Sequence, residues 1–204
     1  MRVGILYSIV RAEEKMILEE LRRRGVQFEL IKDTEVRLEL AGGARRYDVV
    51  LSRCLSHWRA LHTLAALEAQ GVPTVNHWRT VEICGDKLLT HAALVAAGVP
   101  TPRTAVAFGR AAALKTMEEM GFPVVLKPVV GSWGRMVSRI NDVDAAEAVL
   151  EHREAMGSPL YSTYYIQEYV SKPGRDIRTG VFGEDVAYAL YRVSEHWITN
   201  TARG

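Results

Sequence analysis

The first 80 residues alternate short apolar runs with longer stretches of helical character. The run 3–7 (Val-Gly-Ile-Leu-Tyr) has the composition of a buried parallel strand. A helix is predicted over 13–24, where Gly25 follows as a stop signal. The next predicted elements are strands at 27–31, 48–51 and 73–75 and a helix over 58–70. Strands joined by helices predict a small open α/β sheet.

The turn after the first predicted strand lacks the signature of a dinucleotide site. It reads Tyr7-Ser8-Ile9-Val10-Arg11 and contains no glycine. A GxGxxG turn is what allows the backbone to approach a pyrophosphate. The first part of the chain is therefore predicted to be Rossmann-like in shape only.

A domain boundary is expected near residues 76–86, which gives predicted domains of residues 1–80 and 81–204. Asp86 has the side chain of an N-cap for a predicted helix over 87–97. The later predicted elements are helices at 110–120 and 143–156, strands at 124–127, 136–140, 164–170, 176–182 and 186–193, and a glycine loop at 131–134. The fold class is predicted as α/β, with α+β character in the second part.

Composition narrows the class of protein. The chain has 204 residues, of which 48% are hydrophobic and 25% charged, and this excludes wholesale disorder. The formal net charge of +2 is too small to favour nucleic acid as a partner. No apolar run approaches the roughly 18 residues of a membrane helix, and the first residues lack the pattern of a cationic segment followed by an apolar core and a cleavage site. No membrane partner and a cytoplasmic location are therefore expected.

Metal sites built from cysteine or histidine are not predicted. The two cysteines, Cys54 and Cys84, are far apart in the sequence and form no CxxC pair. The six histidines form no HExxH motif. No residue of the chain is assigned as a metal ligand.

Candidate chemistry begins at the apolar strand 124–127. Lys127 closes this strand, and an ammonium group beside buried Val125 costs free energy unless an anion meets it. The loop that follows contains Gly131 and Gly134 and could turn its N–H groups toward a phosphate. It is not a Walker A loop, because no GxxxxGK[ST] occurs in the sequence. The alternative is a lysine that extends to solvent before an ordinary turn.

Two later segments carry polar side chains on predicted strands. In the first, Gln167 and Tyr169 share one face and Glu168 lies on the other, an arrangement that could read an adenine edge and a ribose. The alternative is an edge strand with polar side chains. In the second, Arg178 and Arg192 converge from paired strands, which suits a carboxylate or a transferring phosphoryl group. A cross-strand ion-pair network is the alternative there.

The last residues, 196–204, place polar side chains after an apolar pair and predict a loop that stops in mid-turn. The chain is therefore expected to be C-terminally truncated, with a frayed tail as the alternative.

In their order these segments resemble the ATP-grasp superfamily, and within it the RimK-like carboxylate–amine ligases. The shared motifs are Gly-Asp-Lys at 85–87, VVLKP with its glycine flap, QEYV, DIR and YR. Within this family the chain is most similar to the LysX branch, through residues 131–135, 167–170, 173–178 and 196–204. The resemblance implies an ATP-grasp fold that follows an N-terminal Rossmann-like pre-ATP-grasp domain.

The resemblance also implies which residues hold ATP. Two lysines would contact its phosphates, the flap would cover them, and QEYV would hold adenine and ribose. The implied nucleotide-binding residues are Lys87, Lys127, Gly131, Ser132, Trp133, Gly134, Arg135, Met136, Val137, Gln167, Glu168, Tyr169, Val170, Asp176, Arg178 and Asn200.

The implied reaction joins an amino acid to a carrier protein through an acyl phosphate. Lys127 and Arg192 are the implied catalytic residues. The implied substrate-binding residues are Arg192, Thr201, Ala202 and Arg203. The carrier would be a LysW-like acidic protein, and Asn-Thr-Ala at 200–202 indicates α-aminoadipate, with glutamate as the alternative.

Three further expectations come from the resemblance. The family's Mg²⁺ ligands, an Asp and a Glu-x-Asn, are expected beyond residue 204. The chain as given is therefore expected to bind ATP poorly, and a non-catalytic nucleotide- or carrier-binding module is the alternative to a ligase. A homo-oligomer is expected.

Overall fold

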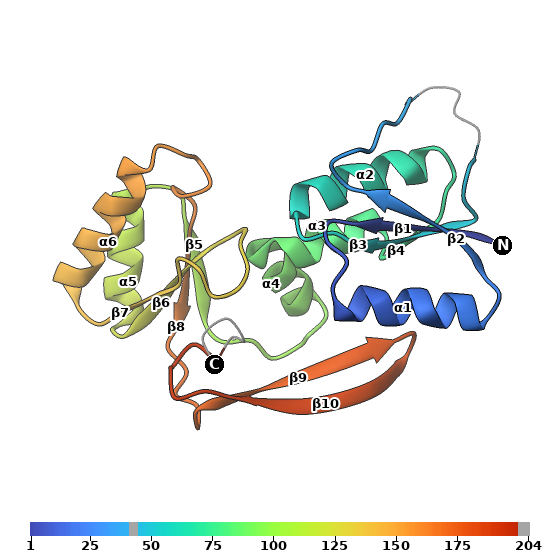
Figure 1. The fold of residues 1–204 in the computed structure, drawn as a ribbon. Coiled ribbons are helices and arrows are strands. Elements are labelled where there is room, and N and C mark those ends of the chain that lie inside the picture. The colour runs from blue at the N-terminus through green and yellow to red at the C-terminus, as the bar shows by residue number, and fades with distance from the viewer. Residues whose placement is uncertain (41–44, 200–204) are drawn as a thin grey trace. The chain divides into compact units, whose positions relative to one another are not determined.

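The fold of the protein was obtained as a computed structural model, which describes residues 1–40 and 45–199 (Figure 1). The chain divides into two compact units, Met1–Gly85 and Asp86–Gly204. Helices and strands occur in both units, which confirms the predicted mixed α/β class.

The first unit is a parallel sheet with helices on both faces (Figure 1). Its strands lie in the order β2-β1-β3-β4. Their bounds are Arg2–Tyr7 (β1), Gln27–Lys32 (β2), Val49–Arg53 (β3) and Thr74–Val75 (β4). The helices are α1 (Ala12–Arg23), α2 (His57–Ala69) and α3 (Trp78–Gly85).

The apolar composition of β1 is explained by burial on both of its faces. Ile5 packs in a cluster with Leu18 of α1, whereas Leu6 packs with Leu64 of α2. Alternate side chains of a strand point to opposite faces, so each of these residues needs an apolar partner helix. The continuous run 3–7 therefore identified this strand correctly as a buried parallel one.

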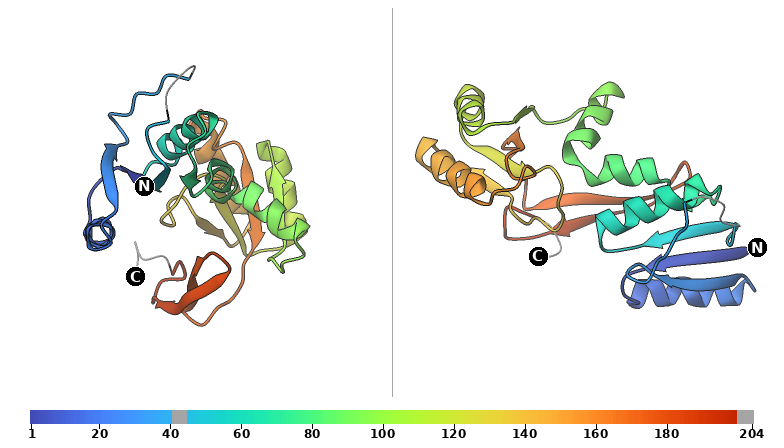
Figure 2. Two further views of the ribbon diagram at one scale, coloured as in Figure 1. Left: turned by 90° about the vertical axis from the view of Figure 1, so that its right-hand side faces the viewer. Right: turned by 90° about the horizontal axis from the view of Figure 1, so that it is seen from above.

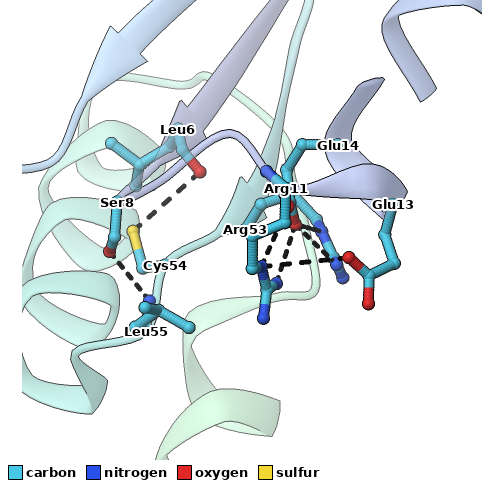
Figure 3. A network of polar contacts seen from close by, with 8 residues as sticks. All are labelled: Leu6, Ser8, Arg11, Glu13, Glu14, Arg53, Cys54 and Leu55. Carbon is cyan, nitrogen blue, oxygen red and sulfur yellow. Dashed lines mark hydrogen bonds and ion pairs between the residues drawn. The ribbon is translucent and has the colours of Figure 1, made fainter. Parts of the chain in front are cut away.

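The turn after β1 is filled by a network of the protein's own charges (Figure 3). Glu14 is buried and accepts hydrogen bonds from the Arg11 backbone N–H at 3.0 Å and from Nε of Arg53 at 2.8 Å. Beside it, the hydroxyl of Ser8 accepts a 2.8 Å bond from the backbone N–H of Leu55. These contacts join the start of α1 to the residues that follow β1 and β3.

The second unit contains an antiparallel sheet in the order β5-β8-β6-β7 and a separate two-stranded ribbon. The sheet strands are Thr104–Ala107 (β5), Val124–Pro128 (β6), Ser138–Ile140 (β7) and Tyr164–Glu168 (β8). The ribbon is β9 (Arg175–Phe182) with β10 (Asp185–Val193), and the helices are α4 (Lys87–Ala96), α5 (Arg110–Met120) and α6 (Val143–Ala155).

One face of the second sheet is apolar and the other carries the candidate chemistry. Val124 and Leu126 of β6 are fully buried against Met117 of α5 and Leu150 of α6. Figure 2 shows these two helices side by side along the sheet. Strand alternation then directs Lys127 to the opposite face. The apolar side of the sheet thus fixes the orientation of its polar side.

Two elements were not predicted. Helix α3 lies within the segment 76–86, which was expected only to separate the two domains, and the two compact units meet between Gly85 and Asp86 in the same segment. Strand β5 was missed because its four residues are too few to show alternation. The strand predicted over 136–140 begins only at Ser138, since Met136 has φ 56°, a left-handed conformation outside the β region. Among the described residues no helix is long and apolar enough to cross a membrane.

Candidate functional site

A cavity of about 650 Å³ opens in the second unit on the polar face of its sheet. Its walls come from β6, β8, the ribbon and the loop between β6 and β7, which we call the flap (residues 131–136). The structure brings the following predicted residues together at this cavity: Lys87, Lys127, Gly131, Ser132, Trp133, Gly134, Arg135, Val137, Gln167, Glu168, Tyr169, Val170, Asp176, Arg178 and Arg192. Met136 does not line it, and Asn200, Thr201, Ala202 and Arg203 lie outside the described residues.

Sequence reasoning missed some of the lining residues, which are Pro102, Val125, Lys172, Trp197, Ile198 and Thr199. Val125 could have been found, because it is two residues from Lys127 on the same strand face. Lys172 directly precedes the Pro-Gly-Arg-Asp segment, but its position gave no signal of its own. Thr199 is placed at the cavity by hydrogen bonds with Lys172 and Asp176, which are distant from it in the sequence, so no local pattern could predict its position.

Three lysines converge on the cavity, and none of them lies within ion-pair distance of a carboxylate among the described residues. Nζ of Lys127 donates to Oε1 of Gln167 at 2.5 Å. Nζ of Lys87 donates to the carbonyl oxygen of Gly131 at 2.8 Å, and Nζ of Lys172 donates to Oγ1 of Thr199 at 2.6 Å. Each ammonium group therefore donates its hydrogen bond to a neutral acceptor, which does not cancel the positive charge of the lysine.

Within this cluster of lysines, burial and the neighbouring positive charges both disfavour the protonated form of Lys127. Burial lowers the pKa of the Lys127 ammonium, and the like charges of Lys87 and Lys172 lower the same pKa further. Burial also lowers the pKa of Lys87, against the opposing effect of Asp86. A site that disfavours its own cations gains free energy when an anion enters, because the anion removes both the desolvation and the repulsion penalties.

The start of α4 places Lys87 at the cavity. The carboxylate of Asp86 accepts hydrogen bonds from the backbone N–H groups of Leu88 at 2.7 Å and Leu89 at 3.1 Å, which confirms the predicted N-cap. The backbone N–H of Lys87 donates to the carbonyl oxygen of Val129 at 2.8 Å. The first turn of this helix is thereby bonded to the segment that leads into the flap.

Gln167 uses both ends of its amide within the protein. Its Nε2 donates to Oγ1 of Thr104 at 3.0 Å and to the hydroxyl of Tyr165 at 3.3 Å, while Oε1 receives Lys127. The Tyr165 hydroxyl lies 3.1 Å from Nδ1 of His91 on α4. In this arrangement the amide orients Lys127, and both of its N–H donors are already used within the protein.

The ribbon contributes an ion pair. Arg192 and Asp176 are opposite each other in the register of β9 and β10, and the guanidinium donates from Nε and Nη2 at 2.7 and 2.6 Å. Arg192 lowers the pKa of the Asp176 carboxyl, and the hydroxyl of Thr199 donates to the same carboxylate. The cross-strand ion pair considered from the sequence is therefore present. Arg178, by contrast, has no ion-pair partner among the described residues.

The flap has the backbone of a tight, glycine-dependent turn. Gly131 and Gly134 have φ values of 148° and 66°, and two non-glycine residues, Trp133 and Met136, also have positive φ. The guanidinium of Arg135 lies 4.9 Å from the centre of the Trp133 ring, a cation–π geometry. Left-handed conformations of non-glycine residues are strained, and such strain concentrates at functional sites.

The charged lining suits a polyanion. Six cationic side chains and two carboxylates line the cavity, and Arg192 already pairs one of the carboxylates. The other, Glu168, accepts a 2.8 Å bond from the backbone N–H of Arg103. The volume and the excess of cations fit a nucleoside triphosphate. Within the described ranges no group of three or more His, Cys, Asp or Glu side chains could hold a metal ion.

Comparison with known proteins identifies the family. Residues 3–83 match the model of the LysX preATP-grasp domain, and residues 84–204 match the RimK-like ATP-grasp domain. The chain belongs to the RimK-like ATP-grasp ligases. This confirms the family inferred from the sequence motifs.

Relatives in this family are similar over nearly the whole chain. The glutamate–LysW ligase ArgX of Sulfurisphaera tokodaii is 41% identical over 100% of this chain and 73% of its own length. The α-aminoadipate–LysW ligase LysX of Saccharolobus solfataricus is 39% identical over 95% of this chain and 72% of its own. A solved RimK-domain ATP-grasp protein from Sphaerobacter thermophilus is 29% identical with a TM-score of 0.84, covering 95% of this chain and 73% of its own.

Proposed function

We propose that this protein is an ATP-dependent ligase that attaches an amino acid to the C-terminal carboxylate of a LysW-type carrier protein. The observation that carries the proposal is the cluster of Lys87, Lys127 and Lys172, which share one cavity and form no direct ion pair with a carboxylate among the described residues. Relatives similar along the whole chain are LysW ligases of two specificities. The predicted domains, 1–80 and 81–204, would supply the pre-ATP-grasp and ATP-grasp parts of this enzyme.

The proposed amino-acid substrate is α-aminoadipate. Support for it comes from Asn-Thr-Ala at 200–202, which is similar to the aminoadipate-using branch. Glutamate is the second candidate, and the 41% identity to a glutamate–LysW ligase favours it. Both substrates have the same α-amino group and differ by one methylene in the side chain, so the chemistry is common to them.

The proposed reaction has two steps. A carboxylate oxygen of the carrier attacks the γ-phosphorus of ATP, the bond to the β-phosphate oxygen breaks, and ADP leaves. The unprotonated α-amino group then attacks the acyl carbon of the acyl phosphate and forms the C–N bond of the amide. The C–O bond between the acyl carbon and the phosphate breaks, and inorganic phosphate leaves with its electron pair. The amine loses its proton as the amide forms.

In these steps the protein contributes positioning and charge. Lys87, Lys127 and Lys172 would neutralise the phosphate oxygens, and neutral acceptors hold all three in place. The flap would exclude water, which otherwise hydrolyses an acyl phosphate. Arg192 would bind a substrate carboxylate while Asp176 fixes its orientation.

ATP is expected to act as its magnesium salt, and the metal would neutralise phosphate charge. The ligands of this metal are expected beyond residue 204, as the family resemblance implies. The roles in positioning and charge neutralisation proposed above are those of residues that line the described cavity, and none of them depends on the metal.

A product assay tests this function. The full-length natural protein is incubated with ATP, a LysW carrier and either α-aminoadipate or glutamate, and the intact mass of the carrier is measured. Addition of one aminoadipyl residue supports the first substrate, and addition of one glutamyl residue supports the second. Nucleotide binding with no addition would favour the non-catalytic module. Size-exclusion chromatography of the same sample tests the expected homo-oligomer.

A further inference from the structure

Arg153 is a buried cation that the proposed reaction does not use. It lies on α6, and only 2% of its surface is exposed. No carboxylate among the described residues pairs with it. Arginine is rarely buried without such a partner, since desolvation of its guanidinium is costly. Ala146 and Leu150, which precede it on the same helix, pack in the apolar core, so an apolar residue would satisfy packing at this position.

The guanidinium of Arg153 contacts the end of the flap. Its Nη2 donates a hydrogen bond of 2.6 Å to the backbone carbonyl oxygen of Met136. Met136 is the last residue of the flap and has φ 56°, and Val137, which follows it, lines the cavity. The hydrogen bond from Arg153 therefore holds the strained backbone of Met136, which is adjacent in sequence to the cavity-lining residue Val137.

A second donor of the Arg153 guanidinium has no hydrogen-bond acceptor among the described residues. This donor is Nη1, which is buried. A buried unsatisfied donor is expensive, particularly on a charged group. Its cost is recovered if the neighbouring backbone has another conformation in which a carbonyl oxygen reaches it.

We propose that Arg153 is a positioning residue for the flap. In the described conformation it fixes the Met136 carbonyl through Nη2, and when the flap closes over nucleotide Nη1 becomes the donor to a second backbone carbonyl of the flap. Closure is then favoured by a hydrogen bond from a charged donor that the described conformation of the flap does not make. The inference rests on the proposed function, because it takes the cavity to be the nucleotide site.

Conservative and disruptive variants test this role in the full-length protein. Arg153→Lys keeps the charge but has no second planar donor, and Arg153→Met removes both. Arg110→Lys is the matched control. Arg110 lies on α5, and its Nη1 is 3.8 Å from Oε2 of Glu154, the residue that follows Arg153 on α6, so that the same kind of substitution is made next to α6 but away from the flap. Thermal unfolding of every variant shows whether it is folded.

Three readouts separate positioning from stability. Arg153→Lys is expected to raise KM for ATP by roughly tenfold or more, the loss expected for one hydrogen bond from a charged donor, with a smaller change in kcat. It should also release more phosphate per amide formed, because a loose flap admits water. Trypsin cleavage after Arg135 should be suppressed by a non-hydrolysable ATP analogue in the wild type and in Arg110→Lys, but not in Arg153→Lys.

The opposite results overturn the inference. If Arg153→Lys lowers only the unfolding temperature, while KM for ATP and nucleotide protection at Arg135 stay as in the wild type, the residue is merely structural. If the wild type shows protection but modifies no carrier, the proposed function fails while the protection assay still decides the role of Arg153. If nucleotide gives the wild type no protection, the inference about Arg153 is wrong, whereas the proposed function is still decided by modification of the carrier.

Discussion

The ammonium group of Lys127 donates a hydrogen bond of 2.5 Å to the side-chain oxygen of Gln167. The two residues lie on neighbouring antiparallel strands, and Thr104 and Tyr165 hold the amide from its other end. A carboxylate at the position of Gln167 would hold the lysine equally well but would cancel its charge. The neutral amide fixes Lys127 in position and leaves its charge available to an anion.

Removing the charge of Lys127 should abolish the reaction and leave the fold intact. For Lys127→Met we expect ligation to fall roughly a hundredfold to a thousandfold, the loss typical of one preorganised charge donor. Initial rates of carrier modification and circular dichroism measure the two effects. Lys115→Met is the control, because Lys115 is exposed on α5 and far from the cavity lining. A Lys127→Met enzyme with wild-type turnover would refute the assignment.

Placing a carboxylate beside Lys127 should weaken nucleotide binding. Gln167→Glu keeps the size of the side chain, but its negative charge pairs with the lysine and repels phosphate. We expect the Kd for ATP to rise about tenfold or more, the size of one hydrogen bond to a charged group, as measured by calorimetry. Gln27→Glu makes the same chemical change at an exposed position of β2 and should bind ATP as the wild type does. An unchanged Kd in Gln167→Glu would show that Lys127 does not face the nucleotide.

The affinity for ATP should decrease with rising pH. Burial and two neighbouring lysines lower the pKa of Lys127, so its ammonium loses its proton below the usual range for lysine. ATP prefers the protonated form, and its binding should therefore be accompanied by proton uptake at alkaline pH. Calorimetry in buffers of different ionisation enthalpy measures this uptake. Lys127→Arg stays protonated throughout and should lose most of the pH dependence; a pH profile identical to that of the wild type would contradict the explanation.

Arg192 should affect the carboxylate substrate more than ATP. Its Nε and Nη2 each donate one hydrogen bond to Asp176, which leaves the remaining N–H groups of the guanidinium for a substrate carboxylate, and lysine cannot serve both partners in this planar geometry. For Arg192→Lys we expect KM for the amino acid or the carrier to rise about tenfold, with KM for ATP changed much less. Steady-state kinetics with each substrate varied in turn decides this. Arg175→Lys, on the same ribbon but outside the cavity lining, is the control.

The buried Glu14 should stabilise the first unit in a pH-dependent manner. Arg11 above all, with Arg53, lowers the pKa of its carboxyl to about 2. The folded state therefore binds the proton less readily than the unfolded state, and the stabilisation is present above the unfolded pKa and is lost as the pH falls toward 2. Glu14→Gln should cost about 2 kcal/mol of unfolding free energy at pH 7, a value reduced because the arginines are partly exposed.

Urea unfolding at pH 7 and at lower pH measures this difference. The gap between wild type and Glu14→Gln should narrow as the pH falls below the ordinary range of a glutamate. Glu13→Gln serves as the control, since Glu13 is well exposed and contacts Arg11 only at 4.0 Å. Equal losses for both variants would show that burial of Glu14 has no special role.

Local patterns were sufficient for most of the fold and for part of the site. Apolar runs and alternation predicted β1 and β6, and Asp86 predicted the start of α4, because each depends on neighbours in the sequence. The contact of Lys172 with Thr199 joins residues 27 positions apart and depends on how the chain returns to the cavity. Arg153 was missed for a related reason, since an arginine on a predicted helix is expected to face solvent.

The positions of the tryptophans give the molecule a built-in optical probe. Of its four indoles, Trp133 and Trp197 line the cavity, whereas Trp58 and Trp78 lie in the first unit. With Trp58→Phe and Trp78→Phe, the tryptophan fluorescence of these 204 residues would come only from Trp133 and Trp197. Quenching of this fluorescence, or a shift of its emission maximum, on addition of nucleotide would then report binding in the cavity in real time, without any attached dye.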